Sequence, residues 1–455
     1  MTARTVLVVG AGPAGAAAAL AARARGAAVV LAERAFAGGN AVAHSLLPSK
    51  VHLAATADLA AYARWGLGSP PEGAPWAVGA HLRWRREAAR TAYEEDLDGA
   101  GVDRVSGAVT FEGPGRARIE GPTGGRDLAF DAVVIATGSV QAFPPGTTPD
   151  GRVVRIARDL ASLDTVPATA AVLGAGPTGV EIATVLAGYG TRVTLVGRAP
   201  GLLPGEDPVL ADALARTLAG RGVELVLAAG VTACAADGDG VRVDLADGRS
   251  LRFETAFVAT GRRGATQGLA VDRLGLAPDG TGYLPVDGCA RTAAPGVFAA
   301  GDVTGEPLVA NKAAAQGAVA GARAASGEGE ADAEGKDLPT LDPAGVPTAV
   351  FSQPEYARVG IAPGSAAAAG LSVWAGDDLA SLRRHVLGRE TSSDAVRVAV
   401  GPAGEVRGAA ILGDGAAERI ALAAAAIAWH VPAAALANLL PVVPSAGETW
   451  TRLRP

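Results

Sequence analysis

Two glycine-rich turns in the sequence have the spacing that binds dinucleotide phosphates. The first contains Gly10, Gly12 and Gly15, which follow an apolar run, and Glu33 ends the next apolar run. Gly10 permits a tight strand-to-helix turn, Gly12 lets a pyrophosphate approach the backbone, and Gly15 lets the helix pack closely. The free N–H groups at the helix start can hold phosphates, and a carboxylate about 20 residues further on can accept a hydrogen bond from a ribose hydroxyl. The pattern predicts a dinucleotide site.

The same spacing recurs at Gly174, Gly176 and Gly179, which predicts a second dinucleotide site. Here the second apolar run ends at Arg198, with no acid where the first unit has Glu33. A carboxylate at this place selects an unphosphorylated ribose, whereas an arginine can pair with a 2′-phosphate. We therefore expect NADPH to be preferred, with NADH possible. The alternative is that Arg198 is only a solvated charge at a strand end.

Three further apolar runs end in glycine turns, as strands beside these sites would. The turns contain Ala136, Thr137 and Gly138, then Ala259, Thr260 and Gly261, and finally Gly301 and Asp302. A carboxylate such as that of Asp302, held in a glycine turn, could accept a hydrogen bond from a polyol hydroxyl.

The elements that must position these turns are parallel strands alternating with helices, so we predict an α/β fold with two Rossmann-like domains. A length of 455 residues allows about three domains. Apolar residues make up 49% and charged residues 19%, which is typical of a folded chain.

Composition also excludes some classes of partner. The chain has 40 basic and 46 acidic side chains without a basic block, so we expect no nucleic-acid partner. The longest apolar stretch, residues 420–429, is far shorter than the roughly 20 residues that cross a bilayer, so we expect no membrane association. The early apolar run is broken by glycines and lacks a basic signal-peptide start, which favours a cytoplasmic protein. Cys234 and Cys289 are the only cysteines, and no histidines have ligand spacing, so we expect neither a disulphide framework nor a metal site.

The ordered motifs resemble the flavoprotein disulphide reductases, the family of dihydrolipoamide dehydrogenase, glutathione reductase and mercuric reductase. The resemblance covers nearly the whole chain. It includes the first fingerprint, GGNAVAHSLLPSK at 38–50, the second fingerprint GAGPTGVE at 174–181, and VPTAVFSQPEYARVGIA at 346–362. It implies a FAD-binding domain split between 1–148 and 263–337, and a NAD(P)-binding domain at 149–262. It also implies a C-terminal α+β dimerisation domain at 338–455 and a homodimer.

The resemblance assigns FAD to the first fingerprint and the nicotinamide nucleotide to the second. Lys50 matches the family lysine near the flavin N5, and Glu181 matches the acid that pairs with it. A positive charge there stabilises reduced flavin; the alternative is that both residues are only structural. The implied cofactor-binding residues are Gly10, Gly12, Pro13, Ala14, Gly15, Glu33, Arg34, Gly39, Lys50, Ala136, Thr137, Gly138, Gly174, Gly176, Gly179, Glu181, Arg198, Gly261, Gly301 and Asp302.

The sequence departs from the family at the residues that exchange electrons with disulphides. Ala41 and Leu46 occupy the two cysteine positions, and Val443 replaces the catalytic histidine, although Glu448 remains. Without a thiol pair or an imidazole, dithiol–disulphide exchange has no route. A substrate pocket lined by Ala41, Leu46, Val443 and Glu448, with the last two from the partner subunit, would suit a flat, weakly polar acceptor.

We therefore predict an FAD-dependent NAD(P)H oxidoreductase that passes electrons to a quinone-like small molecule and is not a disulphide reductase. The stretches 148–151 and 283–288, and Pro-Ser in place of His-Pro, resemble a cysteine-poor branch of NAD(P)H:quinone reductases. The alternatives are a pathway-specific flavoenzyme that acts on a particular metabolite, or a catalytically retired dimeric scaffold. His44 could deliver a proton to a quinol oxygen, or it could be a helix-start histidine bonded to the backbone.

Overall fold

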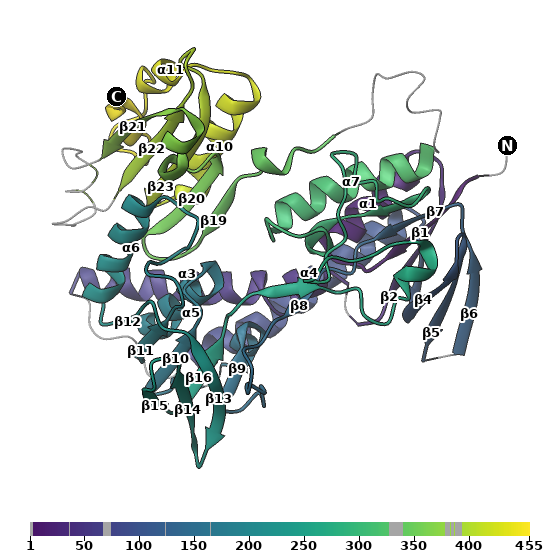
Figure 1. The fold of residues 1–455 in the computed structure, drawn as a ribbon, viewed down its shortest axis with the longest axis horizontal. Coiled ribbons are helices and arrows are strands. Elements are labelled where there is room, and N and C mark those ends of the chain that lie inside the picture. Colours follow the sequence, from purple (N-terminus) through teal and green to yellow (C-terminus); the bar gives the residue numbers. More distant parts are fainter. Residues whose placement is uncertain are drawn as a thin grey trace. The chain divides into compact units, whose positions relative to one another are not determined.

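The computed structural model describes residues 3–35, 37–66, 74–122, 124–163, 165–326, 340–377, 383, 386 and 394–455 (Figure 1). The chain forms two compact units. Unit 1 contains Met1–Pro48, His81–Ala142 and Arg262–Pro343, and unit 2 contains Ser49–Ala80, Phe143–Gly261 and Ala344–Pro455. The predicted domain boundaries stay predictions, and the one between 337 and 338 lies outside the described residues.

Unit 1 is built on a five-stranded parallel sheet in the order β18-β7-β1-β2-β3. Its strands are β1 (Thr5–Val9), β2 (Ala28–Glu33), β3 (Asp103–Ser106), β7 (Ala132–Ile135) and β18 (Val297–Ala299). The chain proceeds from β1 to β2 on one side and later adds β7 on the other side. Parallel strands wound in both directions leave a crevice beside their carboxyl ends, where such sheets bind ligands.

Helices α1 (Pro13–Ala24) and α7 (Ala310–Ser326) pack together in unit 1 through small residues. A Cβ atom added at Gly317 would lie 2.1 Å from the carbonyl oxygen of Ala14, and one at Gly321 would lie 2.0 Å from that of Ala18. Two glycines one turn apart therefore let the helix backbones approach more closely than any larger residue would allow. This close packing gives the alanine-rich helices of the sequence a structural role.

The remaining elements of unit 1 are short. They are α2 (Gly39–Ala43), the antiparallel strands β4 (Ala108–Gly113), β5 (Arg116–Gly121) and β6 (Gly124–Ala129), the pair β8 (Ser139–Gln141) and β17 (Arg262–Gly264), and the 3-10 helices η2 (Val271–Leu274) and η3 (Gly301–Thr304). Helices α3 (Leu46–Arg64) and α4 (Ala74–Gly99) contain residues of both units. Neither these helices nor any other helix in the described ranges combines the length and apolarity of a membrane span.

The first half of unit 2 contains a second five-stranded parallel sheet, with the order β12-β11-β10-β16-β9, in which four strands repeat the arrangement of β3, β2, β1 and β7. The fifth strand differs, because β9 precedes the other four in the chain whereas β18 follows them. Its strands are β9 (Val154–Ile156), β10 (Thr169–Leu173), β11 (Arg192–Val196), β12 (Glu224–Val226) and β16 (Thr255–Val258). Helices α5 (Pro177–Gly188) and α6 (Pro208–Gly220) pack on this sheet, and β13 (Val231–Asp237), β14 (Gly240–Leu245) and β15 (Ser250–Phe253) form an antiparallel sheet. The repeated topology matches the repeated glycine motifs.

The C-terminal part of unit 2 is an α+β structure. Its antiparallel sheet has the order β19-β20-β23-β22-β21. The strands are β19 (Thr348–Val350), β20 (Glu355–Gly360), β21 (Ser372–Asp377), β22 (Ala395–Val400) and β23 (Val406–Gly413). Helix α10 (Ala416–Ala428) packs on β20 and β23, and α11 (Ala433–Ala437) and the 3-10 helix η7 (Ala446–Arg452) follow. The predicted fold class, two Rossmann-like domains and a C-terminal α+β domain, is confirmed.

Candidate active site

The first glycine turn has a geometry that only glycine permits. Gly10 has φ +103°, and a Cβ atom there would lie 2.5 Å from the carbonyl oxygen of Ala136. A Cβ atom at Gly15 would lie 1.7 Å from the carbonyl oxygen of Gly10. The absence of side chains at Gly10 and Gly15 therefore lets the end of β1, the start of α1 and the turn after β7 lie close together in unit 1.

The space in front of Gly12 fits a phosphate group. Among the described residues, the only atom of another segment within 4 Å of a Cβ placed there is the Cα atom of Gly39, at 4.0 Å. Helix α1 begins at Pro13, and no side chain caps its first turn. The backbone N–H groups of Ala14 and Gly15 therefore remain available for an anion, as at other helix N-termini that bind phosphate.

The segment that contains Gly39 forms a second side of this turn. The N–H group of Gly38 donates a hydrogen bond to the carbonyl oxygen of Ala11 at 2.8 Å. A Cβ atom at Gly39 would lie 2.9 Å from the Cα atom of Gly12, so only glycine allows this approach. Two backbone segments thus face one narrow space.

Glu33 ends β2 beside the turn and stabilises it. Its Oε2 accepts a hydrogen bond from the N–H of Ala11 and its Oε1 from the N–H of Ala35, both at 2.8 Å. Each carboxylate oxygen has a second lone pair, so Glu33 can still accept from a ribose hydroxyl. Arg34 is exposed beside it.

Asp302 lies in η3 and belongs to a polar network that the sequence interpretation did not include. Its Oδ2 accepts a hydrogen bond from the hydroxyl of Ser139 at 2.7 Å. The guanidinium of Arg262 donates to that hydroxyl at 2.6 Å and to the carbonyl oxygen of Ser139 at 2.7 Å. Gln316 accepts from the N–H of Gly301 at 2.9 Å and so fixes the start of η3. The network therefore holds one edge of the Asp302 carboxylate.

Two residues of this network, Ser139 and Arg262, were not predicted as site residues, although a sequence pattern marks both. Ser139 and Arg262 each directly follow one of the repeated Ala-Thr-Gly motifs, whose similarity could have drawn attention to them. In the same turn, the buried hydroxyl of Thr137 has no hydrogen-bond partner among the described residues. A buried hydroxyl without a partner fits a site that is completed by a bound molecule.

The second glycine turn, in unit 2, reproduces the geometry of the first. Gly174 has φ +122°, with a would-be Cβ atom 2.2 Å from the carbonyl oxygen of Ala259, and the corresponding distance from Gly179 to the carbonyl oxygen of Gly174 is 1.8 Å. In the described part of the chain, no atom beyond its immediate neighbours lies within 4 Å of a Cβ at Gly176, and α5 starts at Pro177 without a side-chain cap. This turn, with Gly261 after β16, also fits a dinucleotide phosphate.

Arg198 follows the end of β11 and is exposed. Its guanidinium makes no hydrogen bond or ion pair within the described part of the chain, so it is available to an anionic ligand. Leu202 and Leu203 are buried, and Glu206 at the end of this loop accepts hydrogen bonds from Tyr356 and Arg358. The loop is thus anchored, and one exposed arginine remains at the strand end.

Lys50 and Glu181 form the expected ion pair in unit 2. The Lys50 Nζ lies 2.7 Å from both carboxylate oxygens of Glu181. Glu181 also accepts a hydrogen bond from the N–H of Phe351 at 3.0 Å, and the Lys50 Nζ lies 4.5 Å from the centre of the Phe351 ring. The side chains are 27% and 11% exposed, so the ammonium group keeps some contact with solvent.

The predicted acceptor residues of unit 1 lie close together in sequence at the α2–α3 junction. Ala41 is in α2, His44 follows its end, and Leu46, which is 43% exposed, begins α3. The N–H of His44 donates to the carbonyl oxygen of Asn40 at 3.0 Å, so His44 terminates α2 rather than beginning a helix.

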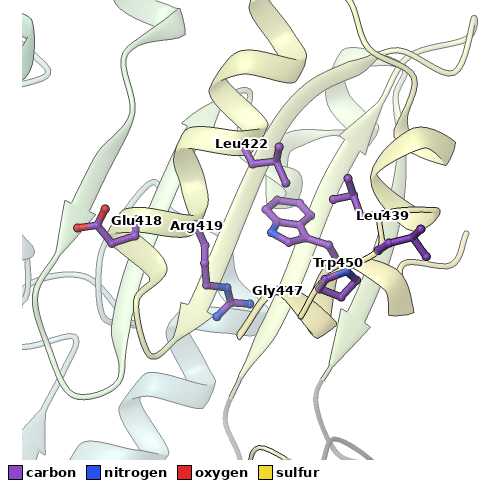
Figure 2. Close-up of a pocket in the computed structure, with 8 residues that line it drawn as sticks. Glu418, Arg419, Leu422, Leu439, Gly447 and Trp450 are labelled. Carbon is purple, nitrogen blue, oxygen red and sulfur yellow. The ribbon is translucent and has the colours of Figure 1, made fainter. Parts of the chain in front are cut away.

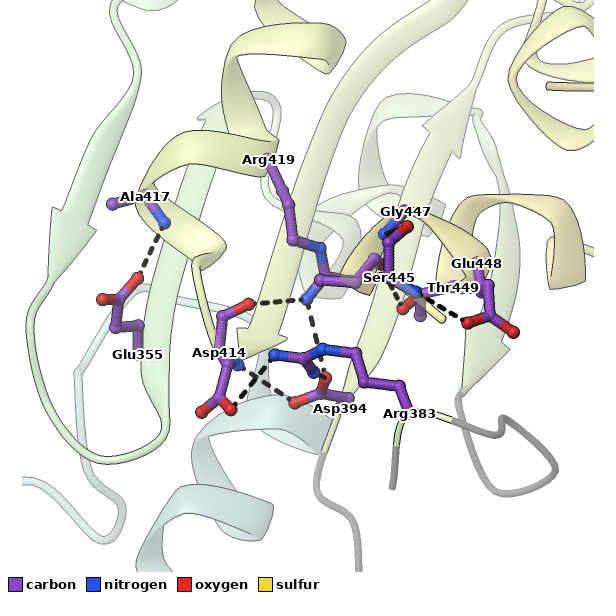
Figure 3. A network of polar contacts seen from close by, with 11 residues as sticks. Glu355, Arg383, Asp394, Asp414, Ala417, Arg419, Ser445, Gly447, Glu448 and Thr449 are labelled. Carbon is purple, nitrogen blue, oxygen red and sulfur yellow. Dashed lines mark hydrogen bonds and ion pairs between the residues drawn. The ribbon is translucent and has the colours of Figure 1, made fainter. Parts of the chain in front are cut away.

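The other two predicted acceptor residues lie in the C-terminal domain of unit 2. Val443 is 56% exposed. Glu448 is buried, and its Oε1 accepts a hydrogen bond from the N–H of Ser445 at 2.9 Å, which caps η7 (Figure 3). A pocket of about 290 Å³ lies beside η7. Its lining includes Leu422, Leu439 and Trp450 (Figure 2). The hydrogen bond between Glu448 and Ser445 stabilises the start of η7 in the C-terminal domain.

Comparison with known families identifies the class of protein. Residues 4–317 match the family model of the pyridine nucleotide-disulphide oxidoreductases, and residues 346–454 match the dimerisation domain of that family. The chain belongs to the pyridine nucleotide-disulphide oxidoreductase family. It is an FAD-dependent oxidoreductase that uses NAD(P)H and carries the family's dimerisation domain.

Individual relatives agree with this assignment. The chain is 34% identical over 386 residues to dihydrolipoyl dehydrogenase 2 of Haloarcula marismortui, covering 81% of this chain and 78% of the relative. It is 31% identical over 463 residues to the dihydrolipoyl dehydrogenase of Chlorobaculum tepidum, covering 98% and 95%. Among solved structures, LpdA of Mycobacterium tuberculosis superposes with a TM-score of 0.89 at 28% identity, covering 98% of each chain.

Proposed function

We propose that this enzyme oxidises NADPH and passes the electrons through FAD to a quinone-like small molecule, without a redox disulphide. The observation that carries the proposal is that Ala41 and Leu46 stand where the resemblance implies the cysteine pair. Of the two cysteines in the chain, Cys234 is buried in β13, and burial raises the pKa of its thiol to about 12. It stays protonated at neutral pH, and disulphide exchange requires a thiolate.

The two glycine turns divide the cofactors between them. In this proposal the first turn, with Glu33 and Asp302, holds FAD, and the second turn, with Arg198, holds NADPH. The N–H groups at the start of α1 and α5 bind the pyrophosphates, and Arg198 pairs with the 2′-phosphate. Bound FAD supplies a two-electron carrier. The net reaction is NADPH + H⁺ + quinone → NADP⁺ + hydroquinone.

Lys50 stabilises the negative charge that develops when the cofactor is reduced. Its ion pair with Glu181 fixes the ammonium group and makes its partial burial tolerable. The proposed acceptor site has apolar walls, formed by Ala41 and Leu46 of one subunit and by Val443 of the partner subunit. Glu448 of the partner subunit lies beside them. This composition favours a planar ring over a peptide-like disulphide. His44 is the candidate proton donor.

In this proposal a homodimer completes the site, because the family resemblance implies that Val443 comes from the partner subunit. The division into domains at 1–148 with 263–337, 149–262 and 338–455 belongs to the same proposal. Both cysteines are free, which suits a reducing compartment such as the cytoplasm.

Parallel assays with three acceptors test the proposal. Holoenzyme of known FAD content is mixed with NADPH and then with a naphthoquinone, lipoamide or glutathione disulphide. We expect ping-pong turnover with the quinone and, with either disulphide, no rate above the slow reaction with oxygen. Turnover with a disulphide would refute the proposal. Flavin that NADPH reduces but no quinone reoxidises would favour a pathway-specific enzyme, and flavin that stays oxidised under NADPH would favour a scaffold.

A further inference from the structure

Three arginines of the C-terminal domain line one pocket. A pocket of about 530 Å³ is lined by Arg397, Arg452 and Arg454, together with residues of β21, β22 and the first turn of α6. Its volume lies in the range of small-molecule sites. The pocket shares no residue with the proposed cofactor or acceptor sites.

Strand register explains why two of these arginines lie on one face of the sheet. Ala375 in β21 pairs with Arg397 in β22 and forms a bridge with Arg454 on its other side. The bridge has N–H to carbonyl distances of 2.8 and 2.9 Å in the two directions. Residues directly opposite each other in paired strands project to the same face. The small side chain of Ala375 therefore leaves a gap between two guanidinium-bearing side chains.

The arginines retain capacity to bind an anion. Arg397 pairs with the buried carboxylate of Asp207 at 3.0 Å, whereas Arg454 donates only to the carbonyl oxygens of Thr451 and Leu453. Neither Arg452 nor Arg454 forms an ion pair within the described residues, and the buried Nε of Arg452 has no hydrogen-bond partner there. Asp377 is the one carboxylate that lines the pocket in the described part of the chain. Guanidinium groups without carboxylate partners bind phosphate and carboxylate oxygens through paired N–H donors.

The remaining lining includes the apolar residues Val209 and Ala395, which are accessible, with the buried Leu210 and Val396 beside them. An inorganic anion alone would leave these walls uncovered and would fill little of the volume. We propose that this pocket binds a small organic oxyanion, a phosphate ester or carboxylate with an apolar body. The oxyanion contacts Arg452 and Arg454, and the apolar body covers Val209, which is 52% exposed.

Calorimetric titration of the holoenzyme tests this proposal, with saturating NADP⁺ present so that both nucleotide sites are filled. The probes are phenyl phosphate, benzoate and inorganic phosphate. We expect phenyl phosphate or benzoate to bind more tightly than inorganic phosphate, and the stronger of the two identifies the preferred oxyanion. Absence of binding by either aryl probe to the wild-type protein overturns the proposal.

Variants then locate the binding site. Arg452→Gln combined with Arg454→Gln should weaken binding of the aryl probe at least tenfold. Ala375→Leu should do so as well without changing any charge, because it fills the gap between the arginines. Arg407→Gln is the matched control, since Arg407 is an exposed arginine of the same domain outside the pocket. Unchanged affinity in both test variants, with flavin reduction by NADPH intact as evidence of folding, also overturns the proposal.

Discussion

The ammonium group of Lys50 is held by an acid and an aromatic ring, and its removal separates the two half-reactions. We expect Lys50→Met to slow flavin reduction by NADPH about tenfold or more, because the charge stabilises reduced flavin as it forms. Reoxidation by a naphthoquinone should slow less. Anaerobic stopped-flow absorbance of the flavin measures both rates.

Two further variants control this measurement. Lys50→Arg keeps the charge and should restore most of the reduction rate, whereas Glu181→Gln removes the partner that fixes the ammonium group and should give an intermediate rate. Equal slowing of reduction and reoxidation in Lys50→Met would contradict the assigned role.

Arg198 gives the second prediction at the residue scale. One partly exposed charge contact with a 2′-phosphate is worth roughly 0.5–2 kcal/mol, which corresponds to a few-fold to about thirty-fold selectivity. We expect NADPH to be preferred within this range and Arg198→Ala to erase the difference in kcat/KM between NADPH and NADH. Arg192→Ala, at the other end of the same strand, is the control. A wild-type preference for NADH would contradict the assignment of Arg198 to the 2′-phosphate.

Among the structural elements, the strand–turn–helix units could be predicted from the sequence because their residues are close together in the chain. A strand, a glycine turn and a helix lie within about 20 residues, so their sterics are visible in the spacing. The contacts of Ser139 with Asp302 and Arg262 join segments 163 and 123 positions apart, and no local pattern indicates them. The pairing of Lys50 with Glu181 was available only through the family resemblance, for the same reason.

The contact between α1 and α7 depends on the absence of side chains. A Cβ atom at Gly321 would lie 2.0 Å from the carbonyl oxygen of Ala18, so one helix must move to accommodate it. We expect Gly321→Ala to lower the free energy of unfolding by about 1–3 kcal/mol. Gly220→Ala is the control and should be neutral or slightly stabilising, because no atom of another described segment lies within 4 Å of a Cβ there. Equal unfolding midpoints for the two variants would contradict the packing argument.

His52 in α3 forms one hydrogen bond with the 3-10 helix η1 (Ala157–Ser162) and one with Tyr189, the residue that follows α5. Its Nε2 lies 2.9 Å from the carbonyl oxygen of Leu160, which can only accept, so Nε2 carries the proton. Its Nδ1 then accepts from the hydroxyl of Tyr189 at 2.9 Å. The sequence interpretation gave His52 no role, since nothing local distinguishes a clamped histidine from an ordinary core one.

Burial lowers the pKa of His52 below its ordinary value of 6.5, so the folded state favours the neutral ring. The resulting stability is fully present above the unfolded pKa and is lost as the pH falls below it. We expect the wild-type free energy of unfolding to fall on acidification below about pH 6.5, by at most about 1.4 kcal/mol per pH unit from this group. Calorimetric unfolding of His52→Gln should show a weaker pH dependence. His430→Gln, at an exposed histidine, should match the wild type, and an unchanged pH dependence in His52→Gln would contradict the argument.

At the scale of the whole molecule, the C-terminal domain exposes apolar side chains that a single chain would not be expected to leave in water. Leu440 is 99% exposed, Val442 81% and Trp429 76%. The domain matches the family's dimerisation domain, and exposed apolar residues of this kind mark association surfaces. The same run of chain contains Val443, so association and the proposed acceptor site depend on neighbouring residues.

Substitutions at Leu440 and Val442 should weaken the dimer and should affect quinone turnover more than flavin reduction. Leu440→Asp combined with Val442→Asp places two carboxylates where the partner would remove water, and an unpaired buried charge costs several kcal/mol. We expect the dissociation constant of the dimer to rise at least tenfold in sedimentation velocity. Val166→Asp, at a partly exposed valine outside this domain, should leave the dissociation constant unchanged.

Because both glycine turns lie within one chain, NADPH should still reduce the flavin of the dissociated variant. Quinone turnover should fall, because Val443 of the partner subunit is withdrawn from the acceptor site. A variant that stays dimeric with wild-type affinity would place the association surface elsewhere, and a monomer with full quinone turnover would show that the acceptor site is complete in one chain.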